Sequence, residues 1–438
     1  MKHKLFGVVA VLMVFAFVLS ACQPAATATP APAEPTEAPA EPTVAPAEPT
    51  EEMAEPTEAE AETGEAPAEG LTFGLLLVGP YNDHGYSQAT YEGGLYVEEN
   101  VPGATMLYVD KVNPADRPGT TPAQLAEDLV SKGATVIIFN SDDMKDSAIE
   151  FATNNPDVYT MHVSGDSAWA EGQDYADLSN LVNVFGRMEY GKMIAGCSAA
   201  LTTQTGQIGY LGPLINDETR RLASSAYLGA RYCWENYAGK DPADLSFKVT
   251  WIGYWFNLPG VTSDPTQVAD DFFNSGYDVV ISGIDTTEAV AEAKKMTDAG
   301  QSAWAIPYDY IGSCEEGADV CLGVPYFNWG PSFKAYIEKA MAGEWSGGWE
   351  WTSPDWADIN NVDTSSVGFV KGDALGEEAS ANVDAFIGEL AGGLNLWSGP
   401  LNLQDGTEYL ADGEAATDQQ IWYLPQLLEG MEGQSVQE

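Results

Sequence analysis

The sequence predicts an α/β protein built from two doubly wound lobes. Short apolar runs of strand length alternate with longer segments of helical periodicity, the pattern of parallel strands joined by helices. This alternation occurs in two successive series along the chain. The roughly 370 residues that follow the N-terminal region also exceed one ordinary domain, which favours two lobes.

The N-terminal region has the features of an exported, lipid-anchored protein. Residues 1–21 contain Lys2 and Lys4, then an apolar run, and end in Leu-Ser-Ala before Cys22, which predicts a secretory signal peptide. The sequence LSAC resembles the bacterial lipobox, so we expect Cys22 to be lipidated and to anchor the chain to the cell membrane, outside the cytoplasm. An ordinary signal peptide with an incidental Cys is the alternative. Residues 22–70, rich in Pro, Ala, Thr and Glu, predict a disordered tether.

The first lobe is expected over residues 71–185. Apolar runs of strand length predict its parallel strands at Phe73–Val78, Thr105–Val109, Thr135–Phe139, Val158–Val163 and Leu181–Phe185. Helices are expected between these strands, for example at Thr121–Lys132 and Lys145–Asn154.

The second lobe is expected over residues 186–308. Its strands are predicted at Gln207–Leu211, Phe247–Gly253, Tyr277–Gly283 and Ala303–Tyr308. Its helices are predicted at Asp217–Tyr237, Asp264–Ser275 and Thr287–Ala299. We expect the chain to return to the first lobe over residues 309–345, and residues 346–438 to complete both lobes.

The charge and the cysteines narrow the range of partners. Without the leader's two Lys and the 12 Glu of the tether, residues 70–438 carry a net charge of −38, so DNA and RNA are not expected partners.

An even number of further cysteines in an exported protein suggests disulfides. Three pairings are open, and we prefer the one that joins two successive helices and closes one short loop: Cys197–Cys233 and Cys314–Cys321. The Cys and His spacing matches no zinc pattern, so neither a metal nor a cofactor is expected.

Signals of catalysis are missing from the sequence. It contains no Gly-x-Ser-x-Gly elbow, no Walker loop, no dinucleotide-binding glycine motif after a strand and no His-x-x-x-His pair. Two lobes in sequence fit either a tandem enzyme or a hinged binding protein. We therefore expect a binding protein and not an enzyme.

Several segments carry a resemblance to one family. GPYNDHGYSQATYEG (79–93) is similar to the Gly-x-x-Asn-Asp-x-x-Phe opening of the basic membrane protein family, the purine nucleoside receptor group of ABC-importer lipoproteins, and similarity continues at 190–212, 308–311, 328–345 and 399–414. The resemblance implies a periplasmic-binding-protein fold of the first type with a cleft between its lobes. It also implies delivery of a purine base or nucleoside to an ABC permease. We expect a monomer that closes about hinges near 185–187, 307–311 and after 344.

The resemblance implies a set of ligand-binding residues in the first lobe. Tyr86 would stack on the purine, while Asn82 and Asp83 would pair with its polar edge; a core aromatic and a helix cap are the alternatives for Tyr86 and Asp83. Ser141, Asp142 and Asp143, which follow a predicted strand, would add hydrogen bonds to a base amino group or a sugar hydroxyl, or would cap the next helix.

The second lobe would supply the opposite wall. Trp255, and after it Phe256, would stack on the ligand, with a place in the core as the alternative for either ring. Asp285 and Asp309 would contact the base or a ribose. Where many relatives have a Lys-Arg pair, this chain has aromatic residues and an Asn: Phe327, Asn328 and Trp329, of which Trp329 has a core position as its alternative. This change suits a flat neutral base and puts a free purine slightly ahead of a nucleoside. Many acids and no clustered Lys or Arg disfavour a nucleotide. The alternatives are a sugar or other small polar ligand on the same fold, and a ligand sensor without a transport role.

Overall fold

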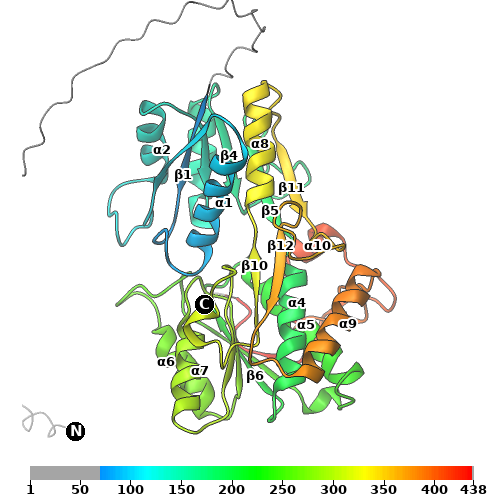
Figure 1. Ribbon diagram of the computed structural model, residues 1–438. Coiled ribbons are helices and arrows are strands. Elements are labelled where there is room, and N and C mark those ends of the chain that lie inside the picture. The colour runs from blue at the N-terminus through cyan, green and yellow to red at the C-terminus, as the bar shows by residue number, and fades with distance from the viewer. Residues whose placement is uncertain (1–69, 437–438) are drawn as a thin grey trace, which may run out of the picture. The chain divides into compact units, whose positions relative to one another are not determined.

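The computed structural model describes residues 70–436 (Figure 1). The predicted signal peptide, Cys22 and almost all of the predicted tether lie outside the described residues. Among residues 70–436, no helix is both long enough and apolar enough to cross a bilayer.

One sheet has six strands, all parallel, in the order β11-β5-β4-β3-β1-β2. The strands are β1 Leu71–Leu76, β2 Ala104–Val109, β3 Ala134–Phe139, β4 Tyr159–Val163, β5 Leu181–Gly186 and β11 Gly348–Thr352. Its inner strands are apolar on both faces, as β3 (ATVIIF) shows with five buried residues, because helices cover both sides. The five strands predicted for the first lobe are confirmed within one or two residues.

Four α-helices accompany this sheet: α1 Tyr86–Asn100, α2 Pro122–Ser131, α3 Lys145–Asn154 and α8 Gly330–Ala342. The short 3-10 helix η1 (Asp142–Met144) leads into α3. Local sequence explains where α2 begins, since Thr121 and Gln124 form a reciprocal capping box ahead of Pro122. α8 follows the second lobe in sequence and packs against α1.

The second sheet has five parallel strands in the order β15-β7-β6-β8-β9. They are β6 Gln207–Gly212, β7 Ser246–Trp251, β8 Val279–Ser282, β9 Trp304–Ile306 and β15 Met431–Glu432. The helices of this half are α4 Met188–Thr202, α5 Asp217–Asn236, α6 Pro265–Asn274, α7 Glu288–Asp298 and α9 Glu377–Ala391, with 3-10 turns η2 Pro242–Asp244 and η3 Glu315–Gly317. The predicted strands and helices of the second lobe are confirmed, although β8 and β9 are shorter than expected.

Segments after residue 320 connect the two halves. β10 (Gly323–Phe327) and β12 (Val367–Lys371) form an antiparallel ribbon, side by side in Figure 1. The ribbon leads into α8 on one side and α9 on the other, and α9 packs against α4. The C-terminal region adds a two-stranded sheet, β13 Leu401–Asn402 with β14 Glu408–Leu410, and the short helix α10 Asp418–Trp422.

Both preferred disulfides are present in the structure. Cys197–Cys233 joins α4 to α5, and Cys314–Cys321 closes a short loop around η3. α4 and α5 approach so closely that a Cβ on Gly196 would lie 1.8 Å from the carbonyl oxygen of Ala226. The disulfide therefore crosses a helix contact that already requires glycine.

Candidate ligand-binding site

A cavity of about 300 Å³ lies where the carboxyl ends of strands from both sheets meet. Every residue that lines it follows such a strand end. The first sheet contributes residues after β1, β3 and β4, namely Tyr86, Ser141, Asp142 and Ser164. The second sheet contributes residues after β6, β7, β8 and β9, namely Glu218, Trp255, Asp285, Tyr308 and Asp309.

Aromatic rings form walls of this cavity on both lobes. Tyr86 is buried at the start of α1, and its hydroxyl donates to the carbonyl of Val163 at 3.3 Å. The rings of Phe327 and Trp329 meet the Tyr86 ring edge-on, with centroids 5.8 and 5.9 Å away, and so support it. Trp255 is equally buried, and its indole Nε1 has no hydrogen-bond partner within the described part of the chain.

Asp309 is a fully buried acid in the cavity wall. Its backbone has a positive φ of 72° and is held against β10 by two hydrogen bonds, from its N–H to Pro325 and from the N–H of Phe327 to its carbonyl. Neither carboxyl oxygen has a hydrogen-bond partner among residues 70–436. Burial raises the pKa of Asp309 well above its usual range, and the positive charge of Lys192 opposes that rise. The neighbouring Tyr308 hydroxyl also opposes it, without reaching hydrogen-bond geometry.

Asp285 and Lys192 complete the charge distribution of this wall. Burial, and then the proximity of Asp309, raise the pKa of Asp285 well above its ordinary value. Lys192 is buried behind the cavity, where its Nζ donates to the carbonyl of Ser282 at 2.7 Å and lies 3.1 Å from the centroid of the Tyr308 ring. Burial lowers the pKa of Lys192 to about 7. The wall is therefore rich in acceptors, with the amine of Lys192 held behind it.

The two lobes touch around the cavity. Ser164 donates to Glu218 at 2.9 Å and Asn216 donates to Asp142 at 3.3 Å, so both of these acids have partners from the opposite lobe. Burial raises the pKa of Glu218 to about 7. At the start of α1, a Cβ on Gly85 would lie 1.7 Å from the carbonyl oxygen of Asp285. The structure is thus closed over the cavity.

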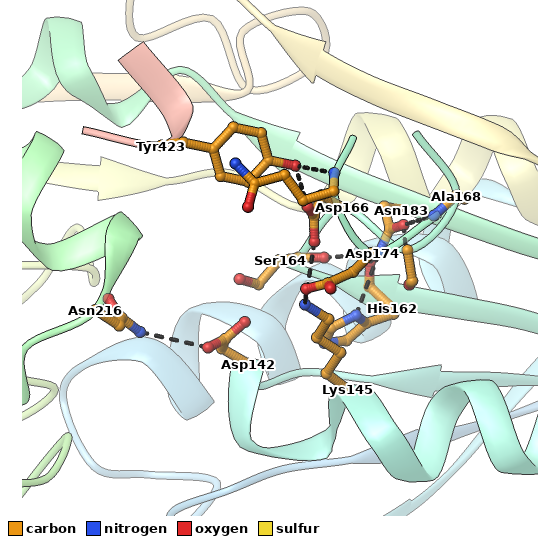
Figure 2. A network of polar contacts seen from close by, with 12 residues as sticks. Asp142, Lys145, His162, Ser164, Asp166, Ala168, Asp174, Asn183, Asn216 and Tyr423 are labelled. Carbon is orange, nitrogen blue, oxygen red and sulfur yellow. Dashed lines mark hydrogen bonds and ion pairs between the residues drawn. The ribbon is translucent and has the colours of Figure 1, made fainter. Parts of the chain in front are cut away.

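A second, polar cavity of about 470 Å³ adjoins the first and shares Asp142, Ser164 and Glu218 with it. Figure 2 shows the network around it, in which Lys145 forms ion pairs with Asp166 and Asp174 and the Tyr423 hydroxyl bonds to Asp166. The remaining lining residues come from lobe loops, α5 and the C-terminal segment: Gly165, Gln173, Asn216, Asp217, Arg221 and Trp422.

Arg221 is the buried cation of this second cavity. Its Nε donates to Glu189 at 2.7 Å, and its guanidinium lies 4.0 Å from the centroid of the Trp422 ring. Lys145 and Arg221 line the same cavity, so the expectation that the cleft has no clustered Lys or Arg is wrong. The acids still outnumber these two cations, because Asp142, Asp166, Asp174, Asp217 and Glu218 line the same space.

His162 supports the Ser141 loop from below. Its Nε2 lies 2.8 Å from the Ser141 carbonyl, and its Nδ1 lies 3.1 Å from the amide nitrogen of Asn183 (Figure 2). An amide nitrogen donates, so Nδ1 accepts and Nε2 carries the proton, as in a neutral ring. Burial lowers the pKa of His162 to about 4, which keeps the ring neutral.

The structure brings together six of the residues predicted for the site. Those lining the first cavity are Tyr86, Ser141, Asp142, Trp255, Asp285 and Asp309. Three lining residues were missed: Ser164, Glu218 and Tyr308. The signal that could have found Ser164 and Tyr308 was available, since each lies at the end of a predicted strand. Glu218 stands in the first turn of a predicted helix, where an acid has a common structural explanation.

The other predicted site residues lie outside the cavity. Asn82 and Asp143 are exposed. The Asp83 carboxylate accepts three backbone N–H groups, from Gly85, Ser87 and Gln88, which is the helix-cap alternative.

The expected wall from Phe327 to Trp329 does not line the cavity either. Phe327 and Trp329 lie behind Tyr86, while Asn328 donates to the backbone of Val362 and Ser365. Phe256 packs on an apolar cluster that also contains Val78 and Phe139 of the first lobe. Phe327 and Trp329 therefore shape the site indirectly, through the Tyr86 ring.

Comparisons with known proteins agree with this architecture. A family model described as PnrA-like ABC transporter substrate-binding protein matches residues 71–382. A purine-binding protein of Brucella abortus is 26% identical over 358 residues, which cover 81% of this chain and 90% of that protein. A Haloferax volcanii protein assigned by name to ABC-transporter glucose binding is 24% identical over 263 residues, covering 60% of this chain and 59% of that protein.

Solved structures share the fold at low identity. An ABC transporter solute-binding protein from Aeropyrum pernix matches with a TM-score of 0.57 at 13% identity, covering 74% of this chain and 90% of that one. One from Conexibacter woesei matches with a TM-score of 0.52 at 17% identity, covering 74% and 97%. The fold is that of type I periplasmic-binding proteins, as the sequence predicted.

Proposed function

Because the chain belongs to the PnrA-like family of ABC transporter substrate-binding proteins, we propose that it captures a purine base or a purine nucleoside and hands it to a membrane permease. Proteins of this family bind solutes outside the cytoplasm and are not enzymes. In our proposal the chain acts as a monomer, held to the membrane through lipidated Cys22 and the tether of residues 22–70.

The observation that carries this proposal is the composition of the first cavity. Tyr86 and Trp255 line it from opposite lobes, and buried carboxyl groups surround the space they leave. Aromatic faces bind flat rings through stacking that is worth about 1–3 kcal/mol per base in nucleic-acid complexes. Carboxylates accept hydrogen bonds from ring and amino N–H groups. The purine-binding relative from Brucella supports the same ligand class.

Capture would proceed by hinge closure. The ligand docks against one lobe while the cleft is open, and the second lobe then closes over it. The Ser164–Glu218 and Asn216–Asp142 hydrogen bonds cross the cleft and would form only on closure. A permease could then distinguish loaded from empty protein by its closed shape.

The second cavity bears on the choice between base and nucleoside. It adjoins the first cavity, and its side chains both donate and accept hydrogen bonds, as sugar hydroxyls require. This observation makes a purine nucleoside as well supported a ligand as the free base. It also keeps a sugar as the second candidate ligand, together with the relative assigned by name to glucose binding.

Calorimetric titration of the unlipidated mature chain, refolded to remove carried-over ligand, tests the proposal. The ligands are adenine, guanine, hypoxanthine, adenosine, guanosine, inosine, ribose and glucose. Binding of any purine compound in preference to the sugars supports it. Binding of glucose or ribose alone would replace the purine with a sugar, and binding of none of these ligands would remove both candidates.

A further inference from the structure

The first cavity has an imbalance between hydrogen-bond acceptors and donors. Four carboxyl groups line it, from Asp142, Glu218, Asp285 and Asp309. Asp142 and Glu218 each accept a hydrogen bond from the opposite lobe, whereas both oxygens of Asp309 are without a partner in the described chain. Asp309 is nevertheless fully buried.

Lys192, whose charge acts on Asp309, does not satisfy this acid. The Nζ of Lys192 donates to the carbonyl of Ser282 and lies over the ring of Tyr308. A buried polar group without a partner is costly, so the missing hydrogen-bond donors must come from what fills the cavity. Asp285 lies close enough that the charge of Asp309 disfavours its ionisation. If the two carboxyl groups share one proton, their four oxygens include only one O–H donor, so acceptors still outnumber donors.

We propose that this pair of carboxyl groups makes the cavity selective for purines that carry an exocyclic amino group. The inference rests on the proposed function and narrows its ligand class to adenine, guanine or their nucleosides. An amino group brings two N–H donors to Asp309 and Asp285, where a ring carbonyl would bring only lone pairs facing other lone pairs. Hypoxanthine and xanthine have carbonyls where adenine and guanine, respectively, have amino groups.

The few free donors of the cavity fit the same ligand. The indole Nε1 of Trp255 and the hydroxyl of Tyr308 are buried in its wall and have no partner among residues 70–436. Purine ring nitrogens without hydrogen accept such bonds. An aminopurine therefore offers donors to the carboxyls and acceptors to these two groups at once.

Matched ligand pairs test the inference directly by calorimetric titration of the unlipidated mature chain. The pairs are adenine with hypoxanthine, guanine with xanthine, and adenosine with inosine. We expect the amino-bearing member of each pair to bind about tenfold to a hundredfold more tightly, as a hydrogen bond to a charged acceptor predicts. Equal or tighter binding of the carbonyl-bearing members overturns the inference while leaving a purine-binding protein. Failure of all purines to bind removes the proposed function as well.

Variants locate the selectivity in the wall. Asp309→Asn replaces an acceptor by an amide that also donates, so it should bring the adenine-to-hypoxanthine affinity ratio close to one. Asp285→Asn gives a second test at the same wall if Asp309→Asn does not fold. Asp157→Asn, at an exposed acid outside the cavity, is the matched control and should keep the ratio of the parent chain. A loss of affinity with an unchanged ratio in both wall variants would mean that these acids are structural only.

Discussion

Gly85→Ala is expected to prevent the lobes from closing. A Cβ at this position would lie 1.7 Å from the carbonyl oxygen of Asp285 and 2.5 Å from its carbonyl carbon. Both atoms belong to the backbone of the opposite lobe, so no side-chain rotation can relieve the overlap. The added methyl group should leave the helix cap from Asp83 in place.

The size of the effect follows from the contacts around the cleft. Ordinary contact begins at 3.4 Å, so the two lobes must move apart locally by about 1.7 Å. Such a shift would break the hydrogen bonds from Ser164 to Glu218, from Asn216 to Asp142 and from Ser313 to the carbonyl of His84, which span 2.9, 3.3 and 2.7 Å. At about 1 kcal/mol each, their loss costs about 3 kcal/mol, which weakens binding roughly 150-fold.

Two measurements check this expectation. Calorimetric titration reports the loss of affinity, and small-angle X-ray scattering reports whether ligand still makes the protein more compact. Gly376→Ala is the matched control, because this glycine also precedes a helix, α9, and a Cβ there meets nothing within 4 Å. If Gly85→Ala binds and compacts like the parent chain, the contact between α1 and Asp285 is not part of the loaded state.

Three further predictions concern stability. Burial lowers the pKa of His162 from 6.5 to about 4, so the neutral ring contributes fully to the free energy of unfolding above pH 6.5. As the pH falls toward 4, the free energy of unfolding should decrease by up to about 3 kcal/mol. Urea titrations across this range should show a smaller decrease in His162→Gln, and parallel curves for the two proteins would contradict the assignment. Asp83→Ala should lower the free energy of unfolding by about 1–2 kcal/mol through loss of the α1 cap, and an unchanged melting temperature would argue against that role. Removal of the Cys197–Cys233 disulfide, which has a sequence separation of 36, should lower the free energy of unfolding in urea titration by about 4 kcal/mol. Removal of Cys314–Cys321, with a separation of 7, should lower it by about 2.5 kcal/mol. The reverse order would contradict the chain-entropy argument.

The nine strands predicted for the two lobes were predictable because each is a short apolar run between turn residues, and their parallel direction follows from alternation with helices. The ends of β8 and β9 were placed too late. In β9 the expected strand included Tyr308, but Pro307 interrupts it and Asp309 adopts a positive φ. The β10–β12 ribbon was not foreseen, because its pairing joins segments about 45 residues apart and neither has a turn signal that points to the other.

The site was partly predictable for the same reason. Tyr86, Trp255 and Asp285 follow strands, and strand ends of an open parallel sheet face the ligand. Composition could not tell which aromatic rings face the cavity, so Trp329 was expected in a wall that it only supports. The second cavity was out of reach, because Tyr423 reaches Asp166 across 257 positions of sequence.

The interlaced course of the chain also has a consequence for folding. The edge strand β11 reaches β5 only after the residues of the second sheet's β6 to β9 have been made, and β7 gains its outer neighbour, β15, from residues 431–432. A chain that emerges from its N-terminus onward would therefore expose an unpaired edge of β5 until residues 348–352 arrive, and an unpaired edge of β7 until residues 431–432 arrive. Open edges invite pairing with other chains. The outer strand of each sheet is thus added late, and loss of residues 431–432 would leave that edge of β7 unpaired.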